Sequence, residues 1–323
     1  MADIGSALAK LDGVVALHEL GVIAAVGADA ANFLHGQLTQ DIAGLGNDQM
    51  RLAALCNAKG RMLASFQVLR PDPEIVLLLC SRDLLAATLK RLTMFVLRAK
   101  VKLSDATETH AIYGLAGGAL AANGIDTTAQ PGQCLGIDIG MADGVSVGVL
   151  QPVGGVARAL WIAPASQAAP AGSPLDAALW RWSEVQSGIV TLSAPVVEAF
   201  VPQMLNYESV GGVNFKKGCY PGQEVVARSQ FRGTQKRRTY LLHSDRTLAV
   251  GDDVLGGTRS DAANEAHEPV GTVAQAAPAP GGGWAALASL QIAAVDAGPL
   301  HAASPAGAVM AIDPLPYALL QDV

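Results

Sequence analysis

The sequence has few charged residues, few aromatic residues and only four cysteines. Charged residues make up 15% and aromatic residues 5% of its 323 positions. No CxxC pair occurs, so the usual spacing of a zinc ribbon or a ferredoxin-type cluster site is absent. A disulfide framework is not expected at this density of cysteine, and we expect no stably bound metal. The cysteines are Cys56, Cys80, Cys134 and Cys219.

Long apolar runs are also missing, although 50% of the residues are hydrophobic and the mean hydropathy is +0.31. The longest obvious run is Ile75–Cys80, whereas a helix needs roughly 18–20 apolar residues to cross a bilayer. The opening residues Met1-Ala2-Asp3 show no basic segment followed by an apolar one, so no secretory signal is visible. These patterns predict a cytoplasmic protein without a membrane partner.

Acidic residues outnumber basic ones, 28 to 22, which gives a formal net charge of −6. Broad nucleic-acid binding draws its affinity from clustered Lys and Arg, so direct nucleic-acid binding is not expected. One local basic cluster is an exception, and it is compatible both with a solvated surface and with an anion-binding site. Its members are Arg228, Arg232, Lys236, Arg237 and Arg238.

The densest group of reactive side chains lies at Lys216–Glu224, where the sequence reads Lys-Lys-Gly-Cys-Tyr-Pro-Gly-Gln-Glu. Glycines on both sides of the reactive part permit unusual backbone angles and the close approach of another molecule. Pro221 suits the first turn of a short helix. Cys219 then precedes a helix N-terminus and lies beside Lys217, and both features favour a thiolate. The alternative is that Cys219 is a small apolar filler.

The first half of the chain alternates short apolar segments with amphipathic ones, which favours an α+β fold over a parallel βαβ series. Helices are expected from Asp29 towards Gln37 and from about Asp83 to Phe95, and Asn57–Gly60 reads as a hairpin-like connection. The expected strands are Val22–Val26, Arg51–Cys56, Met62–Leu69, Glu74–Cys80, Lys100–Leu103, His110–Ala116, Val145–Leu150 and Ala157–Ala163.

A third helix is expected over Leu175–Ser187, after the Pro- and Ala-rich surface connection Pro164–Pro174. Trp180 lies away from the apolar stripe of this helix, because successive residues turn by about 100°. An indole in that position either packs against another domain or forms a platform for a flat ligand.

From Arg238 onward, short apolar segments are broken by Gly, Pro and Asp, which predicts a compact antiparallel barrel or sandwich. Gly281-Gly282-Gly283 is expected to connect a hairpin. The expected strands are Thr239–His243, Val270–Ala274, Trp284–Ile292 and Ala308–Ile312.

The motif around Cys219 reads Lys217-Gly218-Cys219-Tyr220-x-Gly222-Gln223-Glu224 and is followed by Val226-Ala227-Arg228 and Arg232-Gly233. It resembles the signature of the YgfZ family of folate-binding proteins, relatives of the glycine-cleavage T-protein and of a mitochondrial iron–sulfur assembly factor. Weaker matches follow in the family's order at Gly36–Thr39 with Asp41, Asn57–Arg61, Leu97–Val101, Val201–Asn206 and Pro314–Tyr317.

The resemblance implies a GcvT-like α+β fold, with two ferredoxin-like domains and a C-terminal antiparallel β-barrel around a central channel. We expect residues 1–50 and 108–200 to form the first α+β domain and residues 51–107 to form the second. Residues 201–235 would be a connection that bears the motif, and residues 236–323 would form the barrel.

The resemblance also implies that the protein binds tetrahydrofolate or a derivative and assists iron–sulfur cluster synthesis or repair in client enzymes, including radical enzymes that modify tRNA. The expected partners are therefore folate and iron–sulfur client or assembly proteins. Cys219 would be the reactive centre, and Lys217 would lower its pKa and contact folate. Stacking, acceptor and cationic groups for the ligand would come from Trp180, Gln186, Tyr220, Gln223, Glu224 and Arg228.

Several positions depart from the family pattern. Gln186 stands where many relatives have a glutamate that grips the pterin, and Leu20 stands where some have a tryptophan. The acidic pair of the T-protein is replaced by Ala64 and Ser65, so no general acid or base remains at that point. This replacement argues against a folate-dependent one-carbon transferase, which stays as an alternative interpretation. Direct RNA binding by the basic cluster is another alternative.

Histidine offers no further catalytic pattern. The six histidines show no ligand spacing such as HExxH, so metal-dependent hydrolysis is unsupported. His35, alone on its expected helix, is expected to be a structural residue.

Overall fold

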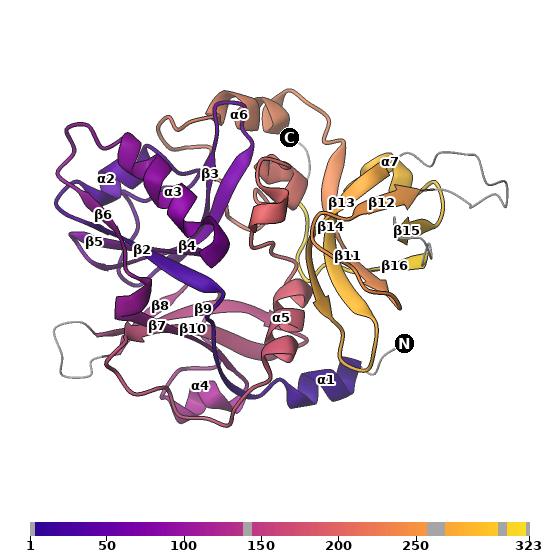
Figure 1. The fold of residues 1–323 in the computed structure, drawn as a ribbon, viewed down its shortest axis with the longest axis horizontal. Coiled ribbons are helices and arrows are strands. Elements are labelled where there is room, and N and C mark those ends of the chain that lie inside the picture. Colours follow the sequence, from indigo (N-terminus) through magenta and orange to yellow (C-terminus); the bar gives the residue numbers. More distant parts are fainter. Residues whose placement is uncertain (1–3, 138–143, 257–268, 303–308, 321–323) are drawn as a thin grey trace.

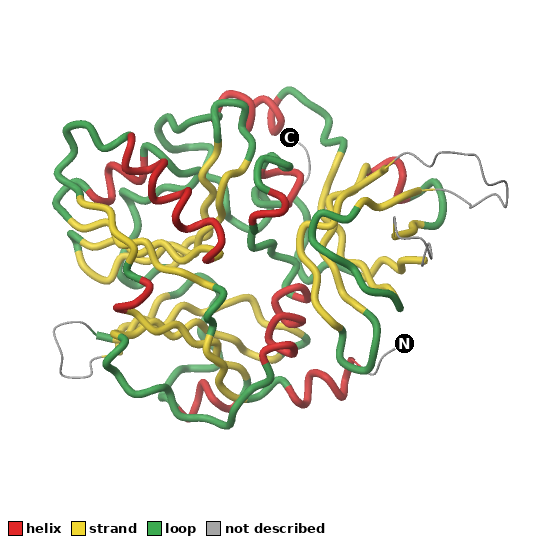
Figure 2. The backbone as a smooth tube through the Cα atoms, in the orientation of Figure 1, coloured by secondary structure: helices red, strands yellow, loops and turns green. Residues whose placement is uncertain are grey.

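The computed structural model describes residues 4–137, 144–256, 269–302 and 309–320. Within these residues the chain forms two five-stranded sheets and a closed six-stranded barrel (Figure 1). Helices pack near both sheets, and the barrel lies on the opposite side of the molecule from the two sheets (Figure 2). The predicted α+β class with a C-terminal antiparallel barrel is confirmed.

The first sheet has the strand order β1-β7-β10-β9-β8. A glycine in its middle makes room for an aromatic ring: a Cβ on Gly114 would lie 2.7 Å from ring atoms of Trp180. The elements of this unit are β1 (Gly13–Ala16), β7 (His110–Ala116), α4 (Gly118–Ala122), β8 (Cys134–Ile137), β9 (Val145–Val153), β10 (Val156–Pro164) and α5 (Ala177–Gln186), preceded by α1 (Ile4–Lys10).

The second sheet has the order β3-β4-β5-β2-β6. The predicted turn at Asn57–Gly60 joins β3 to β4, which pair in antiparallel register. The elements of this unit are β2 (Leu20–Val26), α2 (Ala30–His35), β3 (Met50–Cys56), β4 (Met62–Asp72), β5 (Ile75–Ser81), α3 (Arg82–Met94) and β6 (Lys102–Asp105), followed by a 3-10 turn at Thr107–Thr109.

The predicted domain boundary at residue 50 is wrong. β2 pairs with β5 along its whole length and also with β6, so it lies inside the second sheet. Within the described residues 4–50, β1 is the one strand that joins the first sheet, and Gln49 adds a single isolated bridge to Gln133. The apolar run at residues 22–26 showed that a strand exists there, but not which sheet it enters.

The barrel closes in the order β11-β14-β13-β12-β15-β16. β13 and β14 form the predicted hairpin, with Pro278 opposite Trp284 across the glycine turn. Ala308, at the start of the last expected strand, lies outside the described residues. The elements are β11 (Arg237–Ser244), β12 (Asp253–Gly256), β13 (Pro269–Pro278), β14 (Trp284–Gln291), α7 (Ile292–Val295), β15 (Leu300–Ala302) and β16 (Val309–Asp313).

The connection between the sheets and the barrel contains two 3-10 turns, Ala194–Val196 and Pro202–Leu205, and the helix α6 (Gln223–Phe231). The helix after the cysteine motif was predicted, but Pro221 does not occupy its first turn. Gly222 is the N-cap residue instead, with a φ of 81°, and the helix begins at Gln223.

One apolar core runs through all three units. It includes Leu34 and Phe66 of the second sheet region, Ile162 of the first sheet and Leu287 of the barrel. Helix α5 packs between the first sheet and the barrel, where it contacts β1, β13 and β14 (Figure 1). Helix α5 therefore links the first sheet to the barrel.

A C-terminal strap, Pro314–Leu320, returns from the barrel to the middle of the molecule. The Tyr317 hydroxyl donates a hydrogen bond to the carbonyl of Gly188, just after α5, at 2.8 Å. Further along the strap, the Arg238 guanidinium donates to the Leu320 carbonyl at 3.0 Å. Arg238 also forms a buried ion pair with Glu208 at 2.7 Å. The strap thus joins the barrel to the central connection.

Candidate functional site

The cysteine motif forms a turn that lies against two segments of the second sheet unit. Gly222 touches the hairpin turn Asn57–Gly60 so closely that a Cβ would lie 2.4 Å from the Asn57 carbonyl oxygen and 2.7 Å from the Gly60 Cα. Its positive φ adds a second reason for glycine at this position. The motif therefore depends on Gly222 for its position.

Lys217 fastens the motif to the end of α2. Its ammonium group donates hydrogen bonds to the carbonyl oxygens of His35 and Leu38, the second at 2.6 Å. It also lies 4.9 Å from the centre of the Tyr220 ring. Burial lowers the Lys217 pKa to about 8, against the opposing charges of Asp41 and Cys219. Lys217 is thus a partly buried cation beside the predicted reactive thiol.

Cys219 is the exposed cysteine of the chain, whereas Cys56, Cys80 and Cys134 are buried. Burial raises the pKa of the Cys56 and Cys80 thiols to about 12 and that of Cys134 to about 11. The buried thiols are therefore protonated and enclosed at neutral pH. Of the four, Cys219 alone is open to reagents and partners, as the prediction of a reactive residue requires.

An ionisable pair that the sequence argument did not combine with the motif lies next to it. The Nδ1 atom of His35, at the end of α2, is 2.9 Å from an Asp41 carboxylate oxygen. The Asp41 pKa is lowered, first by the backbone N–H of Gly44 and also by His35 and Arg51. A Cβ on Gly218 would lie 3.6 Å from the His35 Nε2 atom. The signal for this pair, His35 and Asp41 either side of Gly36–Thr39, was present in the sequence.

Trp180 is fully buried, so the packing alternative is the one that the structure adopts. Its ring lies on the bare backbone of Gly114 and is 5.2 Å from the Arg158 guanidinium carbon. Tyr220 is also buried, which raises its pKa. Neither ring presents an open face to a flat ligand in this structure.

The remaining predicted site residues lie at or near the surface. Glu224 and Arg228, four residues apart on α6, form an ion pair with each other, with both side chains largely exposed. Gln223 is the first residue of the same helix, and Gln186 is the last residue of α5; both are half-buried. None of these four residues lines either of the two central cavities described next.

A central pocket of about 310 Å³ lies between the two sheets and the strap. Its polar lining includes the side chains of Arg51, Gln67, Gln151 and Tyr317. A smaller cavity of about 50 Å³ shares Leu52, Gln67 and Leu150 with this pocket, so the two are adjacent. These two adjacent cavities are together called the two-part central cavity below.

The lining of the smaller cavity includes an acid, Glu184, that was not selected from the sequence. Burial raises the Glu184 pKa to about 7, against the lowering effect of Arg158. Among the residues that the structure describes, the buried indole N–H of Trp180 has no hydrogen-bond partner of standard geometry, but it lies close enough to Glu184 to favour the ionised carboxylate. Arg158 is held elsewhere, because it donates to the Ser183 hydroxyl at 2.8 Å and to the Gln151 carbonyl. Glu184 is therefore an acid within the cavity that titrates near neutrality.

Ser65, at the position of the T-protein's acidic pair, also lines the smaller cavity. Its hydroxyl accepts a hydrogen bond from the backbone N–H of Leu192 at 2.8 Å, which makes it part of the wall. Its neighbour Ala64 is buried. Leu20, the other departure from the family pattern, also contributes to this lining.

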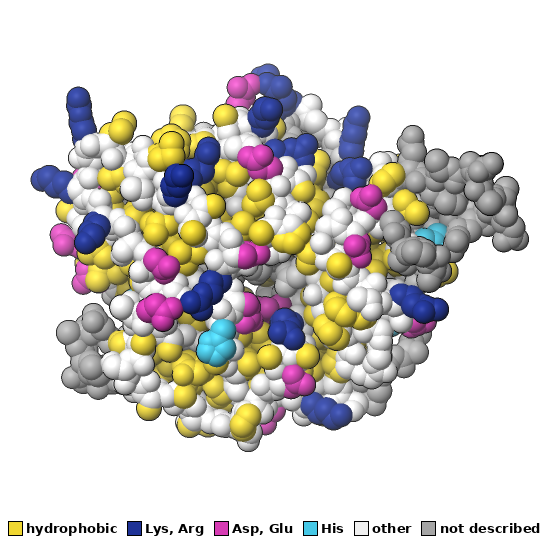
Figure 3. All heavy atoms as spheres, in the orientation of Figure 1, with side chains coloured by type: hydrophobic (Ala, Val, Ile, Leu, Met, Phe, Trp, Pro, Cys, Tyr) yellow, Lys and Arg dark blue, Asp and Glu magenta, His cyan; other side chains and the backbone are white. Residues whose placement is uncertain are grey.

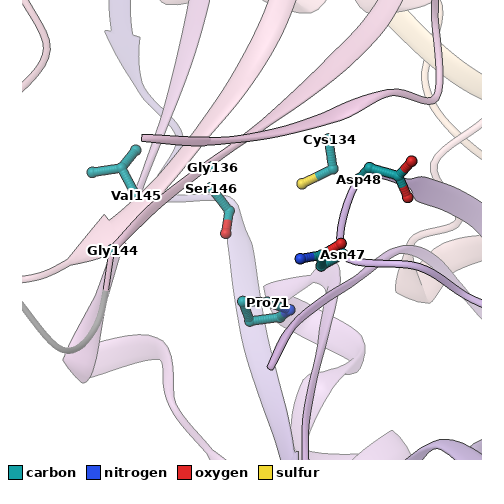
Figure 4. A pocket seen from close by; sticks show the side chains of 8 residues that line it. All are labelled: Asn47, Asp48, Pro71, Cys134, Gly136, Gly144, Val145 and Ser146. Carbon is teal, nitrogen blue, oxygen red and sulfur yellow. The ribbon is translucent and has the colours of Figure 1, made fainter. Parts of the chain in front are cut away.

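Another pocket, of about 400 Å³, lies between the edges of the two sheets. In Figure 4 the Cys134 sulfur and the Ser146 hydroxyl point towards the same open space, and Asn47 and Asp48 approach from the loop before β3. Asp48 also contributes to the raised Cys134 pKa. This pocket contains none of the predicted site residues.

The described residues contain no group of three His, Cys, Asp or Glu side chains placed to hold a metal ion. Among the same residues, every helix is too short or too polar to traverse a lipid bilayer. On the face shown in Figure 3, Lys and Arg side chains are dispersed among acidic ones rather than gathered in a single patch.

Comparison with known proteins gives consistent relatives, although no protein-family model matches the chain. The chain is 28% identical over 252 residues to the tRNA-modifying protein YgfZ of Cronobacter sakazakii, covering 75% of this chain and 74% of the relative. It is 30% identical over 235 residues to the protein of the same name from Edwardsiella ictaluri, covering 67% and 66%. It is 29% identical over 328 residues to the tRNA-modifying protein YgfZ of Yersinia pseudotuberculosis serotype IB, and the match covers 96% of this chain and 93% of the relative.

A solved structure matches the fold over almost the whole chain. The aminomethyltransferase T of the glycine cleavage system from Bartonella henselae superposes with a TM-score of 0.68 at 13% identity, covering 97% of this chain and 89% of that one. The fold thus defines a protein of the GcvT-like class. Within that class, the motif around Cys219 and the sequence relatives identify the particular group: the chain belongs to the YgfZ family.

Proposed function

We propose that this protein binds a reduced folate in its two-part central cavity and serves as an accessory protein for iron–sulfur enzymes, with Cys219 as its reactive group. Its relatives are named for tRNA modification, and in this proposal the link to tRNA is indirect, through iron–sulfur client enzymes that modify tRNA. The observation that carries the folate part is the polar lining of the two adjacent cavities, with the acid Glu184 in the smaller one and the guanidinium of Arg51 in the larger one.

That polarity suits folate because the molecule has donors at one end and negative charge at the other. A pterin presents an amino group and ring N–H groups, for which the Glu184 carboxylate is an acceptor. The glutamate tail carries carboxylates, for which Arg51 is a cation. Arg51 already donates to Gln49 and to backbone carbonyls, which holds its guanidinium in place at the larger pocket. A volume of about 310 Å³ is at the lower end of the usual range for ligand pockets.

The iron–sulfur part depends on the single exposed thiol. A cluster is normally held by several thiolates, and the other three cysteines of this chain are buried. Any cluster contact would therefore be transient or shared with thiolates of the partner. The transferase alternative is less well supported, because Ala64 and Ser65 supply no carboxylate at the position of the T-protein's acidic pair.

The folate part is tested by titrating tetrahydrofolate into the protein under anaerobic conditions in a calorimeter. Replacing Glu184 by Gln removes a charge-assisted bond, and we expect about tenfold weaker binding. The matched control is Glu108→Gln, because Glu108 is 88% exposed and pairs only with Arg82 at the surface. Absence of binding to the wild type would refute the proposal, and equal affinity of the two variants would place the ligand elsewhere.

The iron–sulfur part is tested by complementing a strain that lacks its own protein of this family and assaying an iron–sulfur enzyme. Cys219→Ala and Lys217→Ala are expected to lower client activity. Lys216→Ala is the control, because Lys216 is exposed and adjacent but its side chain has no recorded hydrogen bond in the described structure. Full client activity with Cys219→Ala would leave the motif with a structural role only.

A further inference from the structure

The His35–Asp41 pair beside the motif has the arrangement of a base and its orienting carboxylate. His35 Nδ1 lies 2.9 Å from Asp41, whereas the backbone N–H of Ala43 is 3.4 Å from the same nitrogen. The shorter contact is to a carboxylate, which only accepts, so Nδ1 carries the proton. In the neutral ring Nε2 is then the bare nitrogen, and therefore the basic one.

The basic nitrogen faces the cysteine motif. A Cβ on Gly218 of the motif would lie 3.6 Å from Nε2. Cys219 follows directly and is exposed. The His35 side chain itself is 23% exposed, so water reaches the same space. No hydrogen-bond partner of Nε2 is recorded among the residues that the structure describes.

Lys217 is the other ionisable group next to Cys219, but its protons are engaged. Two hydrogen bonds from its ammonium group go to the carbonyls of His35 and Leu38, and the charge lies over the Tyr220 ring. A group held in this way contributes a positive charge below its pKa of about 8 and anchors the turn. It is poorly placed to exchange a proton with the sulfur.

We propose that His35, oriented by Asp41, accepts the proton of the Cys219 thiol. In this step the S–H bond breaks and an Nε2–H bond forms, directly or through one water molecule, which leaves a thiolate and an imidazolium. The positive charge of protonated Lys217 stabilises the thiolate, and Asp41 stabilises the imidazolium. The inference rests on the proposed reactive role of Cys219 and names the base that serves it.

The charged groups around this proton transfer come from three segments: the loop after α2, strand β3 and the cysteine motif. Asp41 lies on the loop after α2, and Arg51 of β3 approaches the Asp41 carboxylate to 3.7 Å. Lys217 and Cys219 belong to the motif, and Lys217 is within range of the charges of both Asp41 and Cys219. The backbone N–H of Gly44, His35 and Arg51 lower the Asp41 pKa, so Asp41 is a carboxylate that orients His35.

The test measures alkylation of Cys219 by iodoacetamide from pH 5 to 9, followed by mass spectrometry of the peptide that contains it. An isolated thiol is only a few per cent ionised at pH 7. His35→Gln should therefore slow alkylation at pH 7 by about tenfold and move the rise in rate to higher pH. Asp41→Asn should cause a smaller loss. His18→Gln, on an exposed turn, is the control and should react like the wild type.

A second variant separates proton transfer from a merely structural role. His35→Ala leaves a gap that imidazole from solution can enter, and added imidazole should restore the alkylation rate of this variant without accelerating the wild type. Identical pH profiles for the wild type and His35→Gln would overturn the proposal. A slower rate without a changed profile and without rescue by imidazole would overturn it equally. Neither result depends on folate binding or on client activity, so the proposed function is judged separately.

Discussion

Replacing Gly222 by Ala should detach the cysteine motif from the hairpin turn at Asn57–Gly60. The Cβ would lie 2.4 Å from a carbonyl oxygen and 2.7 Å from a Cα, so two backbone segments must separate. The left-handed conformation costs a residue with a Cβ roughly 1–2 kcal/mol. The steric overlap adds roughly 1–3 kcal/mol, as overpacking does elsewhere. We expect a total loss of about 2–5 kcal/mol in the local free energy of unfolding.

Gly155→Ala is the matched control for this prediction. Gly155 has a φ of 84°, close to the 81° of Gly222, but a Cβ at this position would have no atom within 4 Å. It should lose only the conformational part, about 1–2 kcal/mol. A chain with three packed units need not unfold in one step, so the assay is hydrogen exchange of the peptides around residues 57–60 and 218–226. Equal protection in the two variants, with unchanged Cys219 alkylation, would refute the reasoning.

Three further predictions concern the motif, the cavity and the first sheet. Lys217→Met should lose about 2 kcal/mol of stability and expose the motif to proteolysis, because two carbonyls lose a charged donor; a melting temperature equal to that of Lys216→Met would contradict this. Burial raises the Glu184 pKa to about 7 in the folded protein, so above the usual carboxyl pKa the folded state binds more protons than the unfolded state. The contribution of Glu184 to stability therefore falls as the pH rises towards and through 7. Glu184→Gln should remove that fall, seen as a smaller difference in melting temperature between pH 5 and pH 8. Gly114→Ala should destabilise by about 2 kcal/mol because it displaces the Trp180 ring, and normal thermal stability would show that the ring has room to move.

Local patterns in the sequence were sufficient for most of the regular elements. The buried run of β5, the amphipathic helix α3 and the glycine turn between β13 and β14 each have a signal within a few residues, and each lies close to its predicted place. The strands that were not predicted are short, between three and four residues: β1, β8, β12 and β15. Strands of this length are defined by their partners rather than by their own periodicity.

Contacts between distant segments were harder to predict. Nothing local indicates that β2 enters the second sheet, and a boundary at residue 50 was consistent with the strand pattern. Trp180 was predicted to lie away from the apolar stripe of its helix. Its indole packs on the bare backbone of Gly114, which lies 66 positions earlier in the sequence. A helical projection gives the direction of a side chain, but it does not show which residues of other segments pack against that side chain.

In the candidate site, too, the features with a local pattern were predictable, and those that depend on contacts between distant segments were not. The reactive motif was recognisable because its residues are consecutive, and the structure leaves Cys219 exposed next to Lys217. Glu184 and the His35–Asp41 pair were not selected, because their significance comes from the cavity and the turn that they face. Single acids and histidines are common on helices, and only the fold distinguishes these from the rest.

The hydrogen bonds of the C-terminal strap have a practical consequence for handling the protein. The Tyr317 hydroxyl reaches Gly188 beside the cavity wall, and the Leu320 backbone is bonded on both sides, to Arg238 and to the Ser209 hydroxyl. An affinity tag fused after Val323 would pull on residues that close the central pocket. Purification through the other end of the chain, or a tag cleaved before titration, would keep measured ligand affinities free of that disturbance.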